Sequence, residues 1–314
     1  MLDQINQWLT ESEWYDNHKI STILECRRKA FLHLLFQGGL ATTVGPGAWF
    51  GSSIHKGLEV YYNGWGRQSL SQRKDAAFRA FLSTHQHLFS SLDPERLQNK
   101  HTPENGLVIL DDYFSTFAAE DQDYEPINNE LAGIITISPQ EGDPPFFQRS
   151  FLYVFRLDGL WRRSRDSSLW VKETKTTGNV DQEIAKLKMS RQVLGYAYSI
   201  KQWPDGDLVK GILADVIQVA VGPKSARREH IFIGETQLRE WRAGTITIVE
   251  EWRSLCRRAQ DEGLGGKLET FYQDDNSCLR YGRCCFYDLC AHSVALADGM
   301  AKNTWTPFQV MEGE

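Results

Sequence analysis

The stretch from Tyr153 to Gly178 reads YVFRLDGLWRRSRDSSLWVKETKTTG, and it decides the predicted fold. Two runs rich in β-branched and aromatic residues lie on either side of a polar turn, which predicts two neighbouring strands. Asp158 closes the first run, and Glu173 and Lys175 stand two positions apart in the second. Residues two apart in a strand share a face, so we expect Glu173 and Lys175 on one face and Thr174 on the other.

The side chains of this predicted hairpin suit a site for a hard divalent cation. Two carboxylates from adjacent strands supply the oxygen ligands that Mg²⁺ and Mn²⁺ prefer. A lysine beside them can orient or deprotonate a water, or stabilise charge on a phosphate. The pattern therefore predicts metal-assisted phosphodiester hydrolysis. The spacing alone also fits a β-hairpin with a solvated face of acidic and basic residues.

Two predicted helices elsewhere in the chain add side chains of related chemistry. His55 and Glu59 are four apart in GSSIHKGLEVYY, and a neutral imidazole is a common metal ligand. Gln192 and Tyr196 are four apart in SRQVLGYAYSI and share one helix face. An amide and a phenol there can contact a sugar-phosphate backbone or brace the preceding strand. A hydrogen-bonded helix histidine and ordinary boundary residues are the alternatives.

Taken in order, these motifs resemble the RecB-like branch of the PD-(D/E)XK nuclease superfamily. The matching segments are GSSIH with His55, INNELAGIITI with Glu130, RLDG with Asp158, ETK with Glu173 and Lys175, and QVLGY with Gln192 and Tyr196. The resemblance covers residues from about Ser21 to Cys290.

The resemblance also implies roles for these residues. Metal binding falls on His55, Asp158, Glu173 and the backbone carbonyl of Thr174. Lys175 is implied to be catalytic, and Gln192 and Tyr196 are implied to contact DNA or support the site. Glu130 matches an additional acid often seen on the first core strand.

The cysteines form a second pattern. Four of the six fall within CLRYGRCCFYDLC, and Cys26 lies far upstream. Clustered cysteines in a chain without signs of secretion indicate metal binding. A [4Fe–4S] cluster takes four thiolates, whereas a Cys₄ zinc site, the alternative, usually recruits closely spaced cysteine pairs. Cys256 lies in a helical run and is expected to be a small core residue.

One cysteine before the nuclease motifs and three after them resembles the iron–sulfur nucleases of this superfamily, including Cas4-like proteins and the AddB nuclease domain. The resemblance implies that Cys26, Cys278, Cys284 and Cys290 hold a [4Fe–4S] cluster that ties the two ends of the nuclease domain together. The tail here is C-x5-C-x5-C rather than the commoner C-x2-C-x5-C. Cys285 therefore stays open as a substitute for Cys284.

Composition and charge limit the classes of protein to which the chain can belong. With 41% hydrophobic and 12% aromatic residues, this chain of 314 residues is expected to be globular with a large core. Its net charge of −6 argues against tight sequence-specific duplex recognition and fits transient contact with strand ends. No apolar run approaches the roughly 18 residues needed to span a bilayer, so we expect an intracellular, cytoplasmic protein without a membrane partner. No phosphate loop is present to drive unwinding.

The predicted fold class is α/β, a restriction-endonuclease-like mixed sheet flanked by helices. A large N-terminal helical part is expected over residues 1–125, the nuclease core over 126–235, and a C-terminal helix with the cysteine loop over 236–314, packing back on the N-terminus. One helix is expected over 181–202. The aromatics of the helical part either pack in the core or stack on unpaired bases: Trp49, Tyr61, Tyr62 and Trp65.

The expected function is that of a metal-dependent DNA nuclease. A histidine among the metal ligands often accompanies exonuclease action in the family, so the resemblance favours an exonuclease on single-stranded DNA ends, in recombination, repair, or phage- or CRISPR-type DNA processing. The alternative is a partner-dependent or catalytically vestigial DNA-binding subunit of a helicase–nuclease or adaptation complex.

Overall fold

The computed structural model describes residues 13–35, 38–39, 45–90, 99–222, 225–261, 267–279, 283–292 and 301–302. The strands are β1 (Trp14–Tyr15), β2 (Gly38–Gly39), β3 (Tyr124–Ile137), β4 (Phe151–Arg163), β5 (Leu169–Thr177), β6 (Val209–Gln218), β7 (Ala226–Phe232) and β8 (Ala301–Lys302). The α-helices are α2 (Asn17–Glu25), α3 (Arg27–Ala30), α4 (Pro46–Asn63), α5 (Leu70–Phe89), α6 (Pro103–Phe117), α7 (Val180–Lys188), α8 (Arg191–Lys201), α9 (Glu235–Asp261), α10 (Lys267–Thr270), α11 (Asp275–Cys278) and α12 (Tyr287–His292). A mixed sheet flanked by helices confirms the predicted fold class.

The chain forms two compact units, each assembled from separate segments. The sheet unit consists of Val44–Ala132 and Arg156–Leu238. The terminal unit consists of Met1–Thr43, Gly133–Phe155 and Arg239–Glu314. Both units are discontinuous in sequence.

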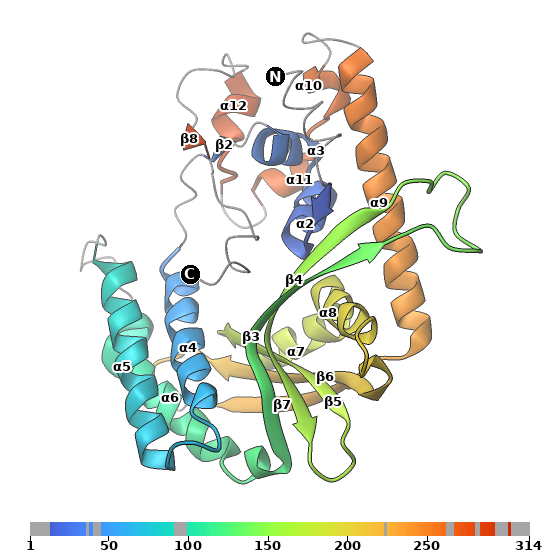
Figure 1. Cartoon of the computed structure of the whole chain (residues 1–314). Helices are drawn as coiled ribbons and strands as arrows, with labels where there is room; N and C mark the ends of the chain where they lie inside the picture. Colours follow the sequence, from blue (N-terminus) through green and yellow to red (C-terminus); the bar gives the residue numbers. More distant parts are fainter. Residues whose placement is uncertain are drawn as a thin grey trace. The chain divides into compact units, whose positions relative to one another are not determined.

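In the sheet unit the strands follow the order β4-β5-β6-β7, and β3 pairs with β4 (Figure 1). The β4–β5 and β6–β7 pairs are antiparallel, and the β5–β6 pair is parallel. The β4–β5 pairing ends at Gly159 opposite Lys172. Asp158 and Glu173 therefore come directly after the point where these two strands cease to pair.

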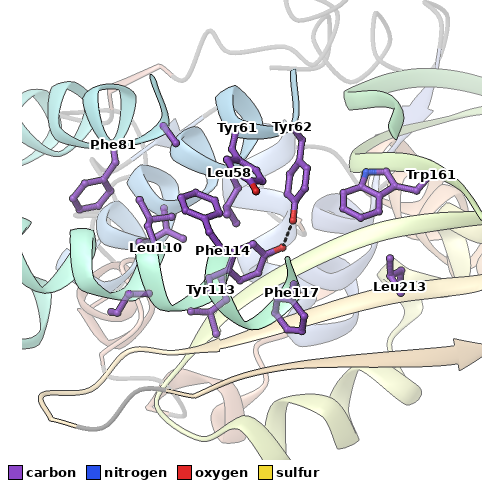
Figure 2. Close-up of a cluster of buried hydrophobic side chains, with 14 of the residues drawn as sticks. Leu58, Tyr61, Tyr62, Phe81, Leu110, Tyr113, Phe114, Phe117, Trp161 and Leu213 are labelled. Atoms are coloured by element: carbon purple, nitrogen blue, oxygen red, sulfur yellow. Dashed lines mark hydrogen bonds between the residues drawn. The ribbon is translucent and has the colours of Figure 1, made fainter. Parts of the chain in front are cut away.

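One face of this sheet packs against the helices that precede it in sequence. Leu213 and Ile217 of β6 belong to one buried cluster with side chains of α4, α5 and α6. Figure 2 shows Tyr61 and Tyr62 within this cluster, and the hydroxyl oxygens of Tyr62 and Tyr113 are 2.9 Å apart. Tyr61 and Tyr62 are thus core residues, which favours packing over base stacking for this pair. Trp65 packs against the same cluster.

Helices α7 and α8 pack against the opposite face of β5 and β6 (Figure 1). The prediction of one continuous helix over 181–202 is wrong, because α7 ends at Lys188 and α8 begins at Arg191. Ser190 explains the break, since its hydroxyl accepts the N–H of Val193 at 3.5 Å and caps the second helix.

The terminal unit joins sequence segments that lie far apart. Its strand β1 pairs in parallel with the start of β4, with Trp14 opposite Leu152. Arg253 of α9 lies 2.7 Å from the carboxylate of Glu13 and donates to the carbonyl of Arg149 at 2.8 Å. Among the described helices, none has the length and apolar character that crossing a bilayer requires.

Candidate active site

The helix α4 brings the predicted histidine to the sheet of the sheet unit. Pro46 occupies the first turn of α4, where a missing N–H is tolerated. Gly51 lets this helix approach β5 closely, because a Cβ there would lie 2.8 Å from the hydroxyl of Thr176. One turn further along, His55 Nδ1 lies 3.4 Å from Asp158 Oδ1. The GSSIH motif thus places an imidazole against the acid that closes the first predicted strand.

Three side chains gather as candidate metal ligands. Ligand atoms of His55, Glu130 and Asp158 all lie within 4.8 Å of one another. One imidazole nitrogen and two carboxylate oxygens form a donor set that suits Mn²⁺ and Mg²⁺. This set contains the additional acid Glu130, and Glu173 stands beside it rather than in it.

Glu130 has an unusual backbone for a strand residue. Its φ is +54°, in the left-handed region that residues other than glycine rarely adopt. Such a conformation costs about 1–2 kcal/mol and persists where the surrounding structure holds it. Strain of this kind concentrates at functional sites, so the backbone marks Glu130 as a candidate independently of its carboxylate.

The strand β5 carries the remaining predicted residues. Lys175 Nζ lies 2.5 Å from Glu173 Oε1, so these side chains share a face as predicted. The N–H of Thr174 donates to Asp158 Oδ2 at 2.6 Å. Because the N–H and C=O of one strand residue point to the same side, the carbonyl of Thr174 also faces the Asp158 side.

Burial and mutual repulsion of the acids shift their pKa values. Burial, followed by the charge of Asp158, raises the pKa of Glu173 from its ordinary 4.5 to about 7. Burial and Asp158 also raise the pKa of Glu130. Burial opposes ionisation of Asp158, but His55 and Lys175 outweigh it and lower the pKa of Asp158. Asp158 thus raises the pKa of two neighbouring acids, and a bound cation would relieve this repulsion.

The Q-x-x-x-Y helix packs beside this strand. On α8, Gln192 Nε2 donates to the hydroxyl of Tyr196 at 2.7 Å, which confirms that the two share a face. Tyr196 is largely buried, and α8 packs against β5 and β6. This geometry suits a brace for the strand that carries Glu173 and Lys175; contact with DNA stays a prediction.

Two basic residues near the candidate ligands were not predicted from the sequence. Arg156 Nε donates to Glu130 Oε2 at 2.7 Å, and its side chain is 54% exposed. Its position two residues before Asp158 is the signal that could have found it, since the two share a strand face. Lys172 lines, with Thr174, a small cavity of about 20 Å³ beside the candidate ligands. That volume is enough for about one water.

Lys172 also belongs to a buried ionic network. It contacts Asp215 of β6, which accepts from Arg228 Nε at 2.7 Å and Nη2 at 2.9 Å and from the hydroxyl of Tyr113. Arg228 Nη1 reaches Asp121 at 2.8 Å. We refer to Lys172, Asp215, Arg228 and Asp121 as the buried network.

The cysteines predicted as cluster ligands all lie in the terminal unit. Cys26 is buried at the boundary of α2 and α3, and its sulfur accepts the N–H groups of Lys29 and Asp274, each at 3.4 Å. The N–H of Cys284 donates to the carbonyl of Cys278 at 2.9 Å. Burial, and then the charges of Cys284 and Cys26, raises the pKa of Cys278. The four predicted ligands thus lie in one unit, where hydrogen bonds link Cys278 with Cys284 and Cys26 with the segment that precedes Cys278.

Cys284 and Cys285 differ in their surroundings. A hydrogen bond from the thiol of Cys285 lowers the pKa of Cys284 to about 6, and the same contact raises the pKa of Cys285. Burial raises the pKa of Cys290. Arg28 opposes this rise, and the charges of Cys26 and Cys284 add to it. Cys256 lies fully buried on α9, as expected of a core residue.

Comparison with known proteins gives only remote structural likenesses. No family model and no curated protein matches the chain. A crystal structure of a "putative exonuclease" from Eubacterium rectale is similar with a TM-score of 0.48 and 13% identity, over 99% of this chain and 96% of that one. The crystal structure of the protein SSO0001 is similar with a TM-score of 0.34 and 10% identity, over 93% and 94%. Likenesses this remote carry no functional argument, and function must be inferred from the site itself.

Proposed function

We propose that the chain is a metal-dependent nuclease that hydrolyses phosphodiester bonds of DNA. The observation that carries this proposal is the gathering of His55, Glu130 and Asp158 within 4.8 Å. The Glu173–Lys175 pair, 2.5 Å apart, lies beside them on the adjoining strand. Ligands for a divalent cation next to a lysine are the groups that phosphodiester hydrolysis needs.

The roles of the residues follow from their contacts. His55, Glu130 and Asp158 would hold Mg²⁺ or Mn²⁺, with Glu173 and the carbonyl of Thr174 as adjoining donors. A bound cation would polarise the scissile phosphate and make the attacking water more acidic. Glu173 holds the ammonium of Lys175, which orients that water. The Thr174 N–H fixes the carboxylate of Asp158.

The finer assignment is an exonuclease that acts on single-stranded DNA ends. It is supported by the RecB-like order of motifs and by the histidine in contact with Asp158. Participation with a helicase or recombination partner is compatible with the lack of a phosphate loop in the sequence. An isolated chain that cuts DNA would favour a free-standing enzyme.

The test is a cleavage assay on anaerobically purified protein. End-labelled single- and double-stranded DNA are incubated with Mn²⁺, Mg²⁺ or EDTA, beside Lys175→Ala. We expect metal-dependent laddering from an end that is lost in this variant. Lys186→Ala is the matched control, because Lys186 is an exposed lysine of the same unit, paired with Glu183 at 3.3 Å. No cleavage by wild-type protein would favour a partner-dependent or vestigial subunit.

We also propose that Cys26, Cys278, Cys284 and Cys290 hold a [4Fe–4S] cluster in the terminal unit. The backbone hydrogen bond between Cys284 and Cys278, and the hydrogen bond from the N–H of Asp274 to the sulfur of Cys26, support this choice. The hydrogen bond from the N–H of Cys284 to the carbonyl of Cys278, at 2.9 Å, favours Cys284 over Cys285 as the ligand. A Cys₄ zinc site is the alternative, and metal analysis of the purified protein distinguishes the two.

The cluster would have a structural role where N- and C-terminal segments already adjoin. Ser277 Oγ donates to the carbonyl of Glu25 at 2.7 Å, and the rings of Phe31 and Phe271 stack at 4.4 Å. A brown protein with iron and sulfide, colourless in Cys26→Ser and unchanged in Cys256→Ala, is the expected result. Cys284→Ser and Cys285→Ser should differ, with iron lost from the first. Zinc in place of iron would overturn the assignment.

A further inference from the structure

Arg156 is a charged residue of the sheet unit that has no role in the proposed mechanism. It lies on β4 two positions before Asp158, so the two side chains share a face. Its guanidinium donates to Glu130 at 2.7 Å while 54% of its side chain stays exposed. A permanent cation therefore stands at the solvent-facing rim of the candidate metal ligands, bound to one of them.

The charges around the site make the contact between Arg156 and Glu130 dependent on whether a metal ion is bound. Three carboxylates (Glu130, Asp158 and Glu173) face two permanent cations (Lys175 and Arg156) and the imidazole of His55. A divalent cation adds two positive charges to this group, and a phosphodiester brings one negative charge. A cation on Glu130 also repels the guanidinium that shares the carboxylate.

We propose that Glu130 holds Arg156 in the metal-free protein, and that Arg156 turns to the phosphodiester of the substrate once a divalent cation engages Glu130. The inference rests on the proposed nuclease function and adds a phosphate-binding residue to it. A guanidinium suits this role, because its fork of donors matches two phosphate oxygens. Phosphate binding by Arg156 would then depend on the metal.

The first measurement needs no DNA and no catalysis. Mn²⁺ is titrated into wild-type protein and Arg156→Ala, and free Mn²⁺ is read by electron paramagnetic resonance. Removing the competitor for Glu130 should tighten Mn²⁺ binding about threefold to fivefold, the scale of an exposed ion pair. Arg227→Ala is the matched control, because Arg227 is 47% exposed and lies 2.8 Å from Asp181, outside the site. It should leave Mn²⁺ affinity unchanged.

The second measurement is DNA affinity in the Lys175→Ala background, which is expected not to cut. Fluorescence anisotropy with single-stranded DNA is recorded in EDTA and in Mn²⁺, with and without Arg156→Ala. Adding Arg156→Ala should weaken binding less than twofold in EDTA and about tenfold or more in Mn²⁺, as loss of a hydrogen bond between charged groups predicts. Arg156→Lys, which keeps the charge but not the fork, should fall between.

The two measurements separate the possible failures. Mn²⁺ affinity unchanged or weakened in Arg156→Ala would overturn the competition for Glu130. An equal loss of DNA affinity in EDTA and Mn²⁺ would overturn the metal-dependent release. If wild-type protein never cleaves DNA, the proposed function fails, but the Mn²⁺ titration still reads the link between Arg156 and Glu130. Circular dichroism of each variant confirms that it folds.

Discussion

Two charged clusters lie along β5, and they differ in how their charges are balanced. In the buried network, Lys172 and Arg228 face Asp215 and Asp121, and the side chains of all four are at most 3% exposed. In the candidate site, the carboxylates of Glu173, Asp158 and Glu130 outnumber the permanent cations Lys175 and Arg156, whose side chains are 30% and 54% exposed. The two clusters include successive residues of one strand, Lys172 and Glu173.

The comparison distinguishes a structural cluster from a functional one. In the buried network each carboxylate is bonded by a cation or a phenol, with the partly exposed Glu120 at its edge, 3.8 Å from Arg228, and the network fixes β6 and β7 against α6. Carboxylates in excess, one of them on strained backbone, are held together at a cost that a bound cation would relieve. The left-handed backbone of Glu130 and the grouping of candidate metal ligands, rather than the presence of charged residues, mark the site.

Breaking the buried network should have the largest effect on stability. Asp215→Ala leaves Lys172 and Arg228 buried without their shared partner, so the free energy of unfolding should fall by about 3–5 kcal/mol. Urea unfolding measures it. Asp111→Ala is the control, since Asp111 pairs with Lys74 at 2.7 Å but is 59% exposed. The free energy of unfolding of Asp111→Ala should fall by at most about 1 kcal/mol. Equal losses would contradict the assignment of the network.

Breaking the candidate site should affect activity instead. Asp158→Asn keeps an oxygen for the Thr174 N–H but removes one charge from the acid-rich group. We expect cleavage to slow about 10²- to 10³-fold, the scale of losing one electrostatic group of an active site. The urea midpoint in EDTA should stay at or above that of wild type. A large loss of stability would mean that Asp158 is chiefly structural.

The raised pKa of Glu173 predicts a pH dependence of metal-free stability. Its pKa in the folded protein is about 7 against an ordinary 4.5, so the folded state holds an extra proton between these values. Stability contributed by this proton is present below about pH 4.5 and is lost as pH rises through 7, by up to about 3 kcal/mol. Urea unfolding in EDTA should show this fall for wild type and a flatter profile for Glu173→Gln. Identical profiles would refute the shift.

The smallest expected effect concerns the backbone of Glu130. Glu130→Gly and Glu130→Ala both remove the carboxylate, but only glycine adopts a φ of +54° without strain. The glycine variant should therefore be about 1 kcal/mol more stable than the alanine variant. Thermal unfolding of the pair measures this. An alanine variant as stable as the glycine variant would show that the left-handed backbone is not retained.

Much of the fold followed from local sequence. Runs of β-branched and aromatic residues located β4 and β5, and the spacing of Glu173 and Lys175 correctly predicted their shared face. The break between α7 and α8 was missed because a single serine cap decides it. The two-residue strand β1 has no local signal, since it forms only by pairing with a strand more than a hundred residues later.

The candidate site was less accessible from sequence. Approach of His55 to Asp158 could be predicted only from the resemblance, because α4 and β4 are distant in the chain. The buried network was not foreseen, since Asp121, Asp215 and Arg228 meet only through the fold. The same holds for the contact of Arg156 with Glu130, although the position of Arg156 relative to Asp158 was readable.

The most direct test of the central claim is an anomalous difference map from crystals containing Mn²⁺. We expect a peak among His55, Glu130 and Asp158, and none at the buried network around Asp215. A peak elsewhere in the sheet unit, or no peak at these three residues at saturating Mn²⁺, would contradict it.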